Sequence, residues 1–128
     1  MALPVKILVV DDHPLVRRTL RSLLAEQRWQ VFEAENGRTA LERIRQVNPD
    51  VVVLDIVMPE LDGLETARRI RQLIPPPKLI LISSHYTPED AAMIARLYGD
   101  GNFIQKSETG KELIPTISRL LPEESQGR

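Results

Sequence analysis

Two runs of almost continuous branched aliphatic residues each end at an aspartate. Residues 5–10 precede Asp11 and Asp12, and residues 51–54 precede Asp55. Strands that are apolar without alternation are typical of parallel sheets covered on both faces. These runs therefore predict buried parallel strands, with acidic residues where each strand ends.

A third, shorter apolar run consists of Phe103 and Ile104, and Lys106 follows it closely. The carboxyl ends of strands in an open parallel sheet line one crevice. We therefore expect three carboxylates and one ammonium at the same edge. Because close carboxylates repel one another, the folded chain needs a cation there.

Amphipathic segments alternate with the apolar runs, so the chain predicts an α/β fold of five parallel strands with five helices on both faces. The remaining strands are expected at residues 30–34, 79–82 and 102–105, with 30–34 at an edge. The apolar helix faces are expected at Val16–Leu24, Ala40–Val47, Leu64–Ile74, Ala91–Tyr98 and Leu113–Leu121.

Proline and capping signals place several helix ends. Pro14 and Pro88 suit the first turn of a helix, and residues 75–77, all proline, predict the end of a helix whose inward face includes Ile74. In the last helix Thr109 and Glu112 have the spacing of a capping box.

Pro115 lies about six residues past that cap, where it removes a backbone hydrogen bond. We predict a kink or a short break at this position. One domain is expected over residues 1–121, with a flexible tail at 122–128.

The composition excludes several classes of function. The formal net charge of −1 provides no general attraction to nucleic acid or to an anionic membrane. Cysteine is absent, which excludes thiolate chemistry and suits a reducing cytoplasm. No apolar run approaches the ~20 residues of a membrane helix.

The expected cluster suits Mg²⁺, which prefers oxygen ligands and keeps several waters. Asp55 is the best candidate nucleophile toward phosphorus because it ends the central strand, and Asp11 and Asp12 would then hold the metal. Mg²⁺ would bind one phosphoryl oxygen, Lys106 a second and the Ser83 hydroxyl a third.

With these motifs the chain resembles the receiver domain of two-component response regulators, in the subgroup usually joined to a helix-turn-helix output domain. The resemblance extends over residues 5–121. Four segments carry it: 9–14 (VVDDHP), 54–63 (LDIVMPELDG), 81–84 (LISS) and 103–106 (FIQK).

The resemblance implies the flavodoxin-like strand order 2-1-3-4-5 and a phosphoryl group accepted by Asp55 from a histidine kinase or phosphotransfer protein. It implies that Asp12 binds Mg²⁺ directly, that Asp11 acts largely through water, and that Asp55 and the Val57 carbonyl complete the ligands. It also implies that the chain catalyses its own phosphorylation and dephosphorylation and is otherwise not an enzyme.

The same resemblance implies a switch. Ser83 would move toward the phosphoryl group, and Phe103 would rotate into the space vacated. The downstream partner would be another protein, an output domain outside this sequence, or a second copy of the chain. Direct binding to nucleic acid or membrane is not expected.

Departures from the family pattern fall mainly on the readout face, where Asp100 and Asn102 replace small residues. Val57 and His85 hold positions that control loss of the phosphoryl group, and they predict slow dephosphorylation. Two alternatives stay open. One is a Mg²⁺-dependent aspartyl-phosphate phosphatase, although Val57 stands where its acid would be; the other is a binding module that is not phosphorylated.

Overall fold

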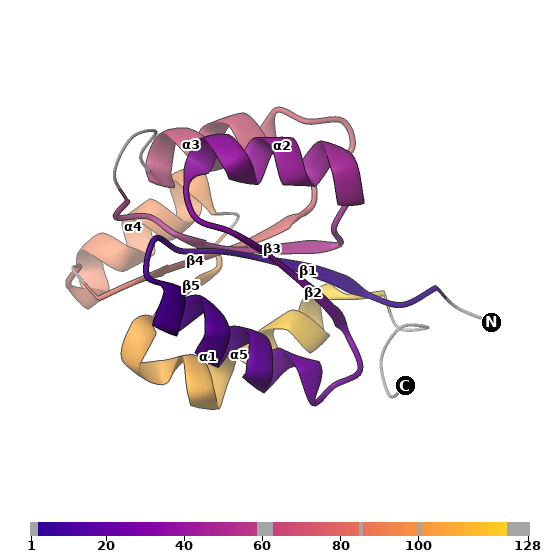
Figure 1. Cartoon of the computed structure of the whole chain (residues 1–128). Coiled ribbons are helices and arrows are strands. Elements are labelled where there is room, and N and C mark those ends of the chain that lie inside the picture. The colour runs from indigo at the N-terminus through magenta and orange to yellow at the C-terminus, as the bar shows by residue number, and fades with distance from the viewer. Residues whose placement is uncertain (1–2, 59–62, 85, 100, 123–128) are drawn as a thin grey trace.

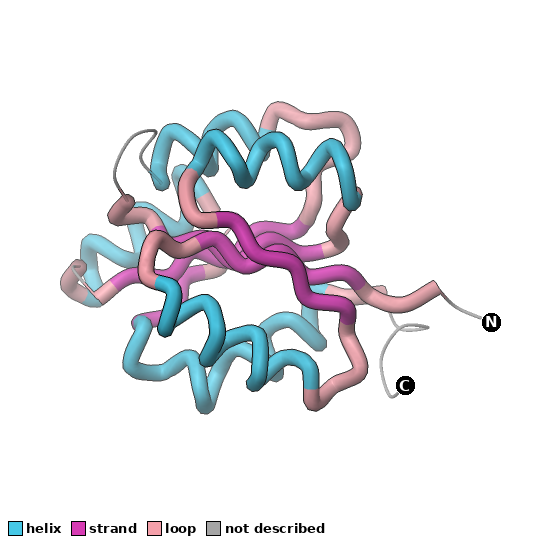
Figure 2. Tube along the Cα trace, viewed as in Figure 1, coloured by secondary structure: helices cyan, strands magenta, loops and turns pink. Residues whose placement is uncertain are grey.

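The computed structural model describes residues 3–58, 63–84, 86–99 and 101–122, and it contains one parallel sheet (Figures 1 and 2). Its strand order is β2-β1-β3-β4-β5. The predicted fold class and order are confirmed. The strands are β1 (Lys6–Val10), β2 (Gln30–Ala34), β3 (Val51–Asp55), β4 (Lys78–Ser83) and β5 (Phe103–Gln105).

Helices cover both faces of the sheet, as Figure 1 shows: α2, α3 and α4 lie on one side, and α1 and α5 on the other. A short 3₁₀ helix, η1 (Lys106–Glu108), leads from β5 into α5. The helices are α1 (Pro14–Ala25), α2 (Gly37–Val47), α3 (Gly63–Arg71), α4 (Pro88–Tyr98) and α5 (Thr109–Leu120).

The continuous apolar runs are explained by burial on both faces. In β1, Ile7 and Val9 belong to the core beneath α1 and α5, whereas Leu8 and Val10 belong to the core beneath α2 and α3. All four are fully buried. Because side chains alternate along a strand, a strand between two helical layers needs apolar residues at every position.

Most predicted helix starts are confirmed. Pro14 and Pro88 each occupy the first turn of their helices, and the Thr87 hydroxyl caps α4 by accepting from the Asp90 N–H. A capping box that the sequence analysis missed begins α2, where the Asn36 side chain accepts from the Thr39 N–H at 2.9 Å.

The inward placement of Ile74 is wrong. Helix α3 ends at Arg71, and the Ile74 side chain is 97% exposed, whereas Leu73 packs against the core. Proline at residue 75 disfavours the helical conformation of the residue before it. The helical period therefore does not extend to Ile74.

The capping box and the break expected in α5 are also absent, whereas the kink expected at Pro115 stays a prediction. The capping box does not form, because η1 makes Glu108 the cap residue and the Thr109 hydroxyl instead donates to the Lys106 carbonyl at 2.9 Å. The helix runs without a break across Pro115. Lys111 and Pro115 are both exposed, so water can bond the carbonyl that Pro115 leaves without a partner.

Some predictions lie outside the described residues: the loop at 59–62, His85, Asp100 and the tail from residue 123. Within the described part of the chain, no helix is both long and apolar enough to cross a membrane.

Candidate functional site: an acidic cluster closed by a lysine

Three of the predicted site residues meet at the carboxyl edge of the sheet. Asp11 follows β1, Asp55 is the last residue of β3, and Lys106 directly follows β5. The Lys106 Nζ atom lies 2.9 Å from Asp11 Oδ2 and 3.1 Å from Asp55 Oδ2. One ammonium therefore joins carboxylates from two neighbouring strands.

The cluster is largely removed from solvent. The side chain of Asp11 is 0% exposed, that of Asp55 is 3% exposed, and that of Lys106 is 21% exposed. Buried charges of one sign are expensive unless they are paired. The lysine is thus a structural requirement of the acidic pair as well as a candidate ligand for an anion.

The backbone fixes the orientation of Asp55. Its Oδ1 atom accepts a hydrogen bond from the Val57 N–H at 3.0 Å, and its Oδ2 atom faces Lys106. Gly63, at the start of α3, passes against the same segment: a Cβ there would lie 2.1 Å from the Ile56 Cα and 2.6 Å from the Asp55 carbonyl oxygen. The close approach of α3 to the end of β3 therefore requires glycine.

The electrostatics follow from burial and pairing. Burial raises the pKa of the Asp55 carboxyl above its ordinary value, and the Asp11 charge acts in the same direction, although the Val57 N–H and Lys106 oppose it. Burial alone would lower the pKa of Lys106, but the close contact with Asp11 and the charges of both aspartates raise it above its ordinary value. The ammonium is thus held in its charged form.

Asp12 and His13 extend the cluster toward solvent. Ligand atoms of Asp11, Asp12 and His13 lie within 4.8 Å of one another, and His13 Nδ1 is 3.0 Å from Asp12 Oδ1. Among the described residues, none gives the buried atoms Asp11 Oδ2 and Asp12 Oδ1 a hydrogen bond of good geometry, although the Lys106 ammonium is close to the first and the His13 ring to the second. Carboxylate oxygens left in this state fit a hard divalent cation such as Mg²⁺.

Ser83 and Phe103 lie on the neighbouring strands. Asp55 pairs with Ile82 across β3 and β4, so fully buried Ser83 stands one position beyond it at the same edge. Phe103 is half-buried and packs against the core beneath α3, as does Tyr86 in the loop before α4. Val57, which follows the cluster, has a side chain that is 40% exposed.

Sequence reasoning missed several contacts around these residues. The Gln105 side-chain amide donates to the Tyr86 carbonyl at 3.1 Å, and Arg17 donates to the Asp11 carbonyl at 2.8 Å. Both hydrogen bonds join residues on different elements, so no local sequence pattern predicts them. Arginines at 17 and 21, one turn apart on one helix, were the only available signal for the second contact.

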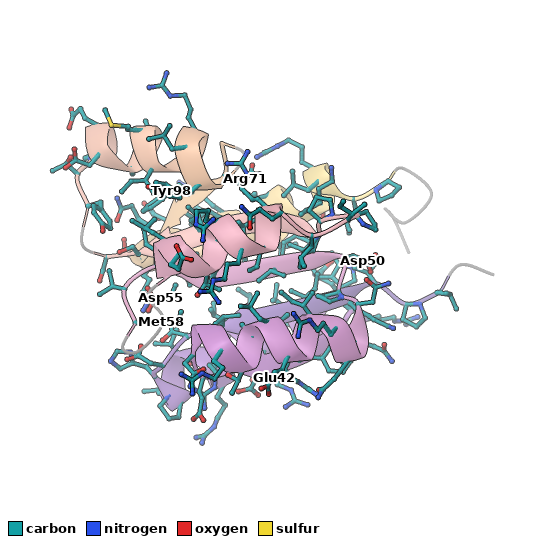
Figure 3. The ribbon with its side chains drawn as sticks, turned by 90° about the horizontal axis from the view of Figure 1, so that it is seen from above. Glu42, Asp50, Asp55, Met58, Arg71 and Tyr98 are labelled. Atoms are coloured by element: carbon teal, nitrogen blue, oxygen red, sulfur yellow. The ribbon has the colours of Figure 1, made fainter. Side chains whose placement is uncertain are left out.

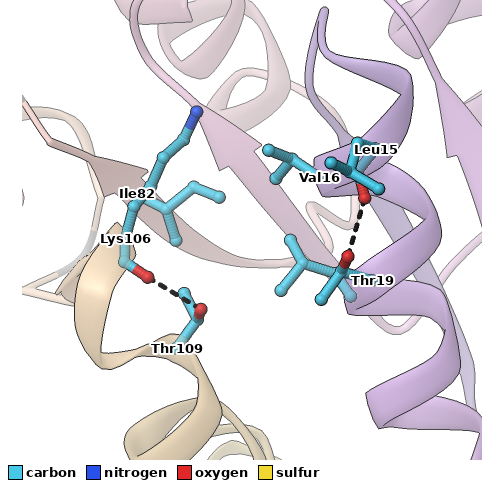
Figure 4. Close-up of a pocket in the computed structure, with 7 residues that line it drawn as sticks. Leu15, Val16, Thr19, Ile82, Lys106 and Thr109 are labelled. Atoms are coloured by element: carbon cyan, nitrogen blue, oxygen red, sulfur yellow. Dashed lines mark hydrogen bonds between the residues drawn. The ribbon is translucent and has the colours of Figure 1, made fainter.

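A cavity of about 260 Å³ lies beside the cluster, between α1 and the start of α5 (Figure 4). Its walls are mainly aliphatic, including Leu15, Val16 and Ile82, with the stem of Lys106 on one side. The hydroxyls of Thr19 and Thr109 donate to the carbonyls of Leu15 and Lys106, shown as dashed lines in Figure 4.

A model of the response regulator receiver domain matches residues 7–118, and the chain belongs to this family. Among solved structures, the response regulator TrrA from Thermotoga maritima, crystallised in complex with Mg²⁺-BeF, is 36% identical with a TM-score of 0.80. The match covers 91% of this chain and 99% of that one.

Curated relatives include response regulator MprA of Mycolicibacterium vanbaalenii, 38% identical over 120 residues, covering 93% of this chain and 51% of the relative. A protein-glutamate methylesterase/protein-glutamine glutaminase of Trichodesmium erythraeum is 47% identical over 81 residues, which are 62% of this chain and 23% of the relative. This chain thus spans about half or less of these relatives. The resemblance to a receiver domain is confirmed.

Proposed function

We propose that this receiver domain is a phosphoacceptor switch in which Asp55 takes a phosphoryl group from a phosphohistidine of a kinase or phosphotransfer protein. The observation that carries the proposal is the Lys106 ammonium, which contacts the carboxylates of Asp11 and Asp55 at one edge of the sheet. This arrangement presents a buried carboxylate, further acidic groups and a fixed positive charge to an incoming phosphoryl group.

In the proposed reaction an oxygen of Asp55 attacks phosphorus, the P–N bond to the donor imidazole breaks, and the imidazole nitrogen keeps the bonding electron pair. A P–O bond to Asp55 forms, giving a mixed anhydride. The reaction spreads negative charge over the phosphoryl oxygens. Lys106 would bind one of these oxygens and the Ser83 hydroxyl another, so both residues act by stabilising charge rather than by exchanging protons.

Mg²⁺, when bound, supplies neutralisation of phosphoryl charge and orientation of the donor. Asp11, Asp12, Asp55 and the Val57 carbonyl are the proposed residues that hold it. Within the described part of the chain no well-formed hydrogen bond reaches the buried oxygens Asp11 Oδ2 and Asp12 Oδ1, which supports this assignment.

The signal would leave through β4 and β5. A phosphoryl group carries roughly −1.5 to −2 charge and three acceptor oxygens, and Ser83 can donate to one of them. Movement of Ser83 would pull inward the loop that precedes α4. In this loop the Tyr86 carbonyl accepts a hydrogen bond from the Gln105 side-chain amide. Phe103 would then rotate, changing the face formed by α4, β5 and α5.

We assign residues 1–121 to the receiver domain and residues 122–128 to a tail. The domain catalyses only its own phosphorylation and dephosphorylation. Because longer relatives continue beyond the matched part, the proposed output is a linked domain, a separate protein or a second copy of this chain. Because the phosphoryl donor would be a kinase, the proposed location of the domain is the cytoplasm.

The exposed aliphatic side chain of Val57 offers no acid or base at that position, which disfavours the phosphatase alternative.

Mass spectrometry after incubation with acetyl phosphate and Mg²⁺ tests the proposal. The wild type should gain the mass of one phosphoryl group, whereas Asp55→Ala should gain none. Asp50→Ala serves as a control because Asp50 belongs to the same strand region but lies at its other end (Figure 3). Modification of Asp55→Ala, or no modification of the wild type, would refute the assignment.

A further inference from the structure

A pair of arginines on α1 surrounds one glutamate of β2. Arg17 Nε donates to Glu33 Oε1 at 3.1 Å, and Arg21 Nη1 donates to Glu33 Oε2 at 3.0 Å. The two arginines are one helical turn apart, so they present their side chains on the same face. The exposed fractions of the side chains are 16% for Arg17, 28% for Glu33 and 59% for Arg21.

Only one of these arginines reaches the acidic cluster. Arg17 Nη1 donates to the backbone carbonyl of Asp11 at 2.8 Å, while the N–H of Asp11 donates to the Ala34 carbonyl at 3.2 Å. Both polar groups of the Asp11 backbone are therefore held by groups outside β1. Ala34 and Glu33 are adjacent in β2. This strand therefore holds Asp11 directly through the Ala34 carbonyl and indirectly through Glu33 and Arg17.

The carbonyl of Asp11 belongs to the peptide that links Asp11 to Asp12. Rotation of that peptide changes ψ of the first residue and φ of the second, and so alters the relative directions of the two carboxylates. A planar guanidinium with several fixed donors can hold a carbonyl and a carboxylate at once. Arg17 does so, with Glu33 fixing the guanidinium.

We propose that Arg17 is a positioning residue that fixes the Asp11–Asp12 peptide so that both carboxylates face one divalent cation, with Glu33 holding the guanidinium in place. The inference rests on the proposed function because it takes Asp11 and Asp12 as the metal-holding pair. Arg17 touches neither the metal nor the phosphoryl group. Groups that orient metal ligands typically change metal affinity by about 10–100-fold when they are removed.

Four variants test the role: Arg17→Met, Arg17→Lys, Glu33→Gln and Arg21→Met. Arg21→Met is the matched control, since Arg21 shares Glu33 but makes no contact with Asp11. Mg²⁺ affinity is measured by isothermal titration calorimetry, the phosphorylation rate with acetyl phosphate by mass spectrometry, and the unfolding midpoint in urea on the same samples.

Arg17→Met should weaken Mg²⁺ binding by about tenfold and slow phosphorylation at limiting Mg²⁺, with the rate recovering at saturating Mg²⁺. Arg17→Lys should recover part of the affinity because an ammonium can still donate to the carbonyl. Glu33→Gln keeps the shape of the pair and should give a smaller loss of about threefold. Arg21→Met should bind Mg²⁺ within about twofold of the wild type.

Equal Mg²⁺ affinity in Arg17→Met and Arg21→Met would overturn the inference, as would a loss in Arg17→Met that saturating Mg²⁺ does not restore. If Arg17→Met does not fold, Glu33→Gln compared with Arg21→Met decides by the same criterion. Failure of the wild type itself to bind Mg²⁺ or to be phosphorylated would instead refute the proposed function.

Discussion

The two ends of the sheet use the same residue types in different ways. Figure 3 shows Asp50 and Asp55 at opposite ends of β3. At the amino end, exposed Asp50 accepts from the backbone N–H of Lys6 at 2.9 Å, and the Lys6 ammonium donates to the Val47 carbonyl at 3.1 Å. Each of these charges is satisfied by a backbone group.

At the carboxyl end, by contrast, charges satisfy one another. Asp11, Asp55 and Lys106 are largely buried and form two ion pairs through one ammonium. Removing the lysine would leave two carboxylates with uncompensated charge in a poorly hydrated place. Burial, rather than residue type, therefore makes this end of the sheet responsive to a change in charge, as a phosphoryl switch requires.

The largest expected effect comes from the lysines. Lys106→Met should lower the free energy of unfolding by about 3 kcal/mol, because it leaves two buried carboxylates unpaired. Lys6→Met at the amino end should cost about 0.5 kcal/mol, since it removes one hydrogen bond to a carbonyl. Urea unfolding followed by circular dichroism measures both. Equal losses in the two variants would remove the distinction between the ends.

Glycines test how tightly the carboxyl end is packed. Gly63→Ala should destabilise the fold by about 2 kcal/mol, because its Cβ would collide with the backbone of Asp55 and Ile56. Gly110→Ala is the matched control: its Cβ would meet no described neighbour within 4 Å, and alanine in a helix should stabilise by about 0.5 kcal/mol. Thermal unfolding gives the two shifts, and a neutral Gly63→Ala would contradict the packing argument.

The pH dependence of stability sharpens the contrast. Because the pKa of Asp55 is raised in the folded state, the folded state binds a proton more tightly than the unfolded chain. Stability from this residue should therefore increase as pH falls from neutrality through the folded-state pKa. Asp55→Asn should remove this gain and stabilise the protein at neutral pH by about 1 kcal/mol.

Urea unfolding at about pH 7.5 and pH 5 measures the Asp55 effect. Asp50→Asn should change the free energy of unfolding by less than about 0.5 kcal/mol, because its side-chain oxygen can still accept from the Lys6 N–H. Glu65 should show the opposite pH dependence of stability. Hydrogen bonds from Arg68 and Arg69 lower its pKa to about 2, so its contribution to stability is lost as pH falls from its unfolded-state pKa toward 2. A destabilised Asp55→Asn protein at neutral pH would contradict the prediction.

The smallest effect concerns side-chain amides. Gln105→Leu should cost about 0.5 kcal/mol by removing the hydrogen bond to Tyr86, and should speed amide hydrogen exchange at Tyr86. Asn102→Ala, at the other end of β5, removes a comparable bond to the Leu79 carbonyl. It should not change exchange at Tyr86. Unchanged exchange in Gln105→Leu would show that this contact does not hold the loop.

Local patterns predicted some features and failed for others in ways that have a physical cause. Pro14 and Pro88 mark helix starts correctly because a fixed φ acts on the residue itself. Ile74 fitted a helical period, but α3 ends before reaching it. Thr109 had the spacing of a cap, but the path of the chain out of β5 through η1 made it part of the helix instead.

The residue pattern alone specifies the parallel α/β architecture and the placement of Asp11, Asp55 and Lys106 at one edge, because uninterrupted apolar runs require cover on both faces and all parallel strands end on the same side. Which atoms meet depends on the packing of the folded chain: one ammonium lies between two carboxylates, Gly63 lies against the Asp55 backbone, and Arg17 donates to the Asp11 carbonyl. Such contacts depend on how helices dock against strands distant in sequence, and no local periodicity encodes those distances.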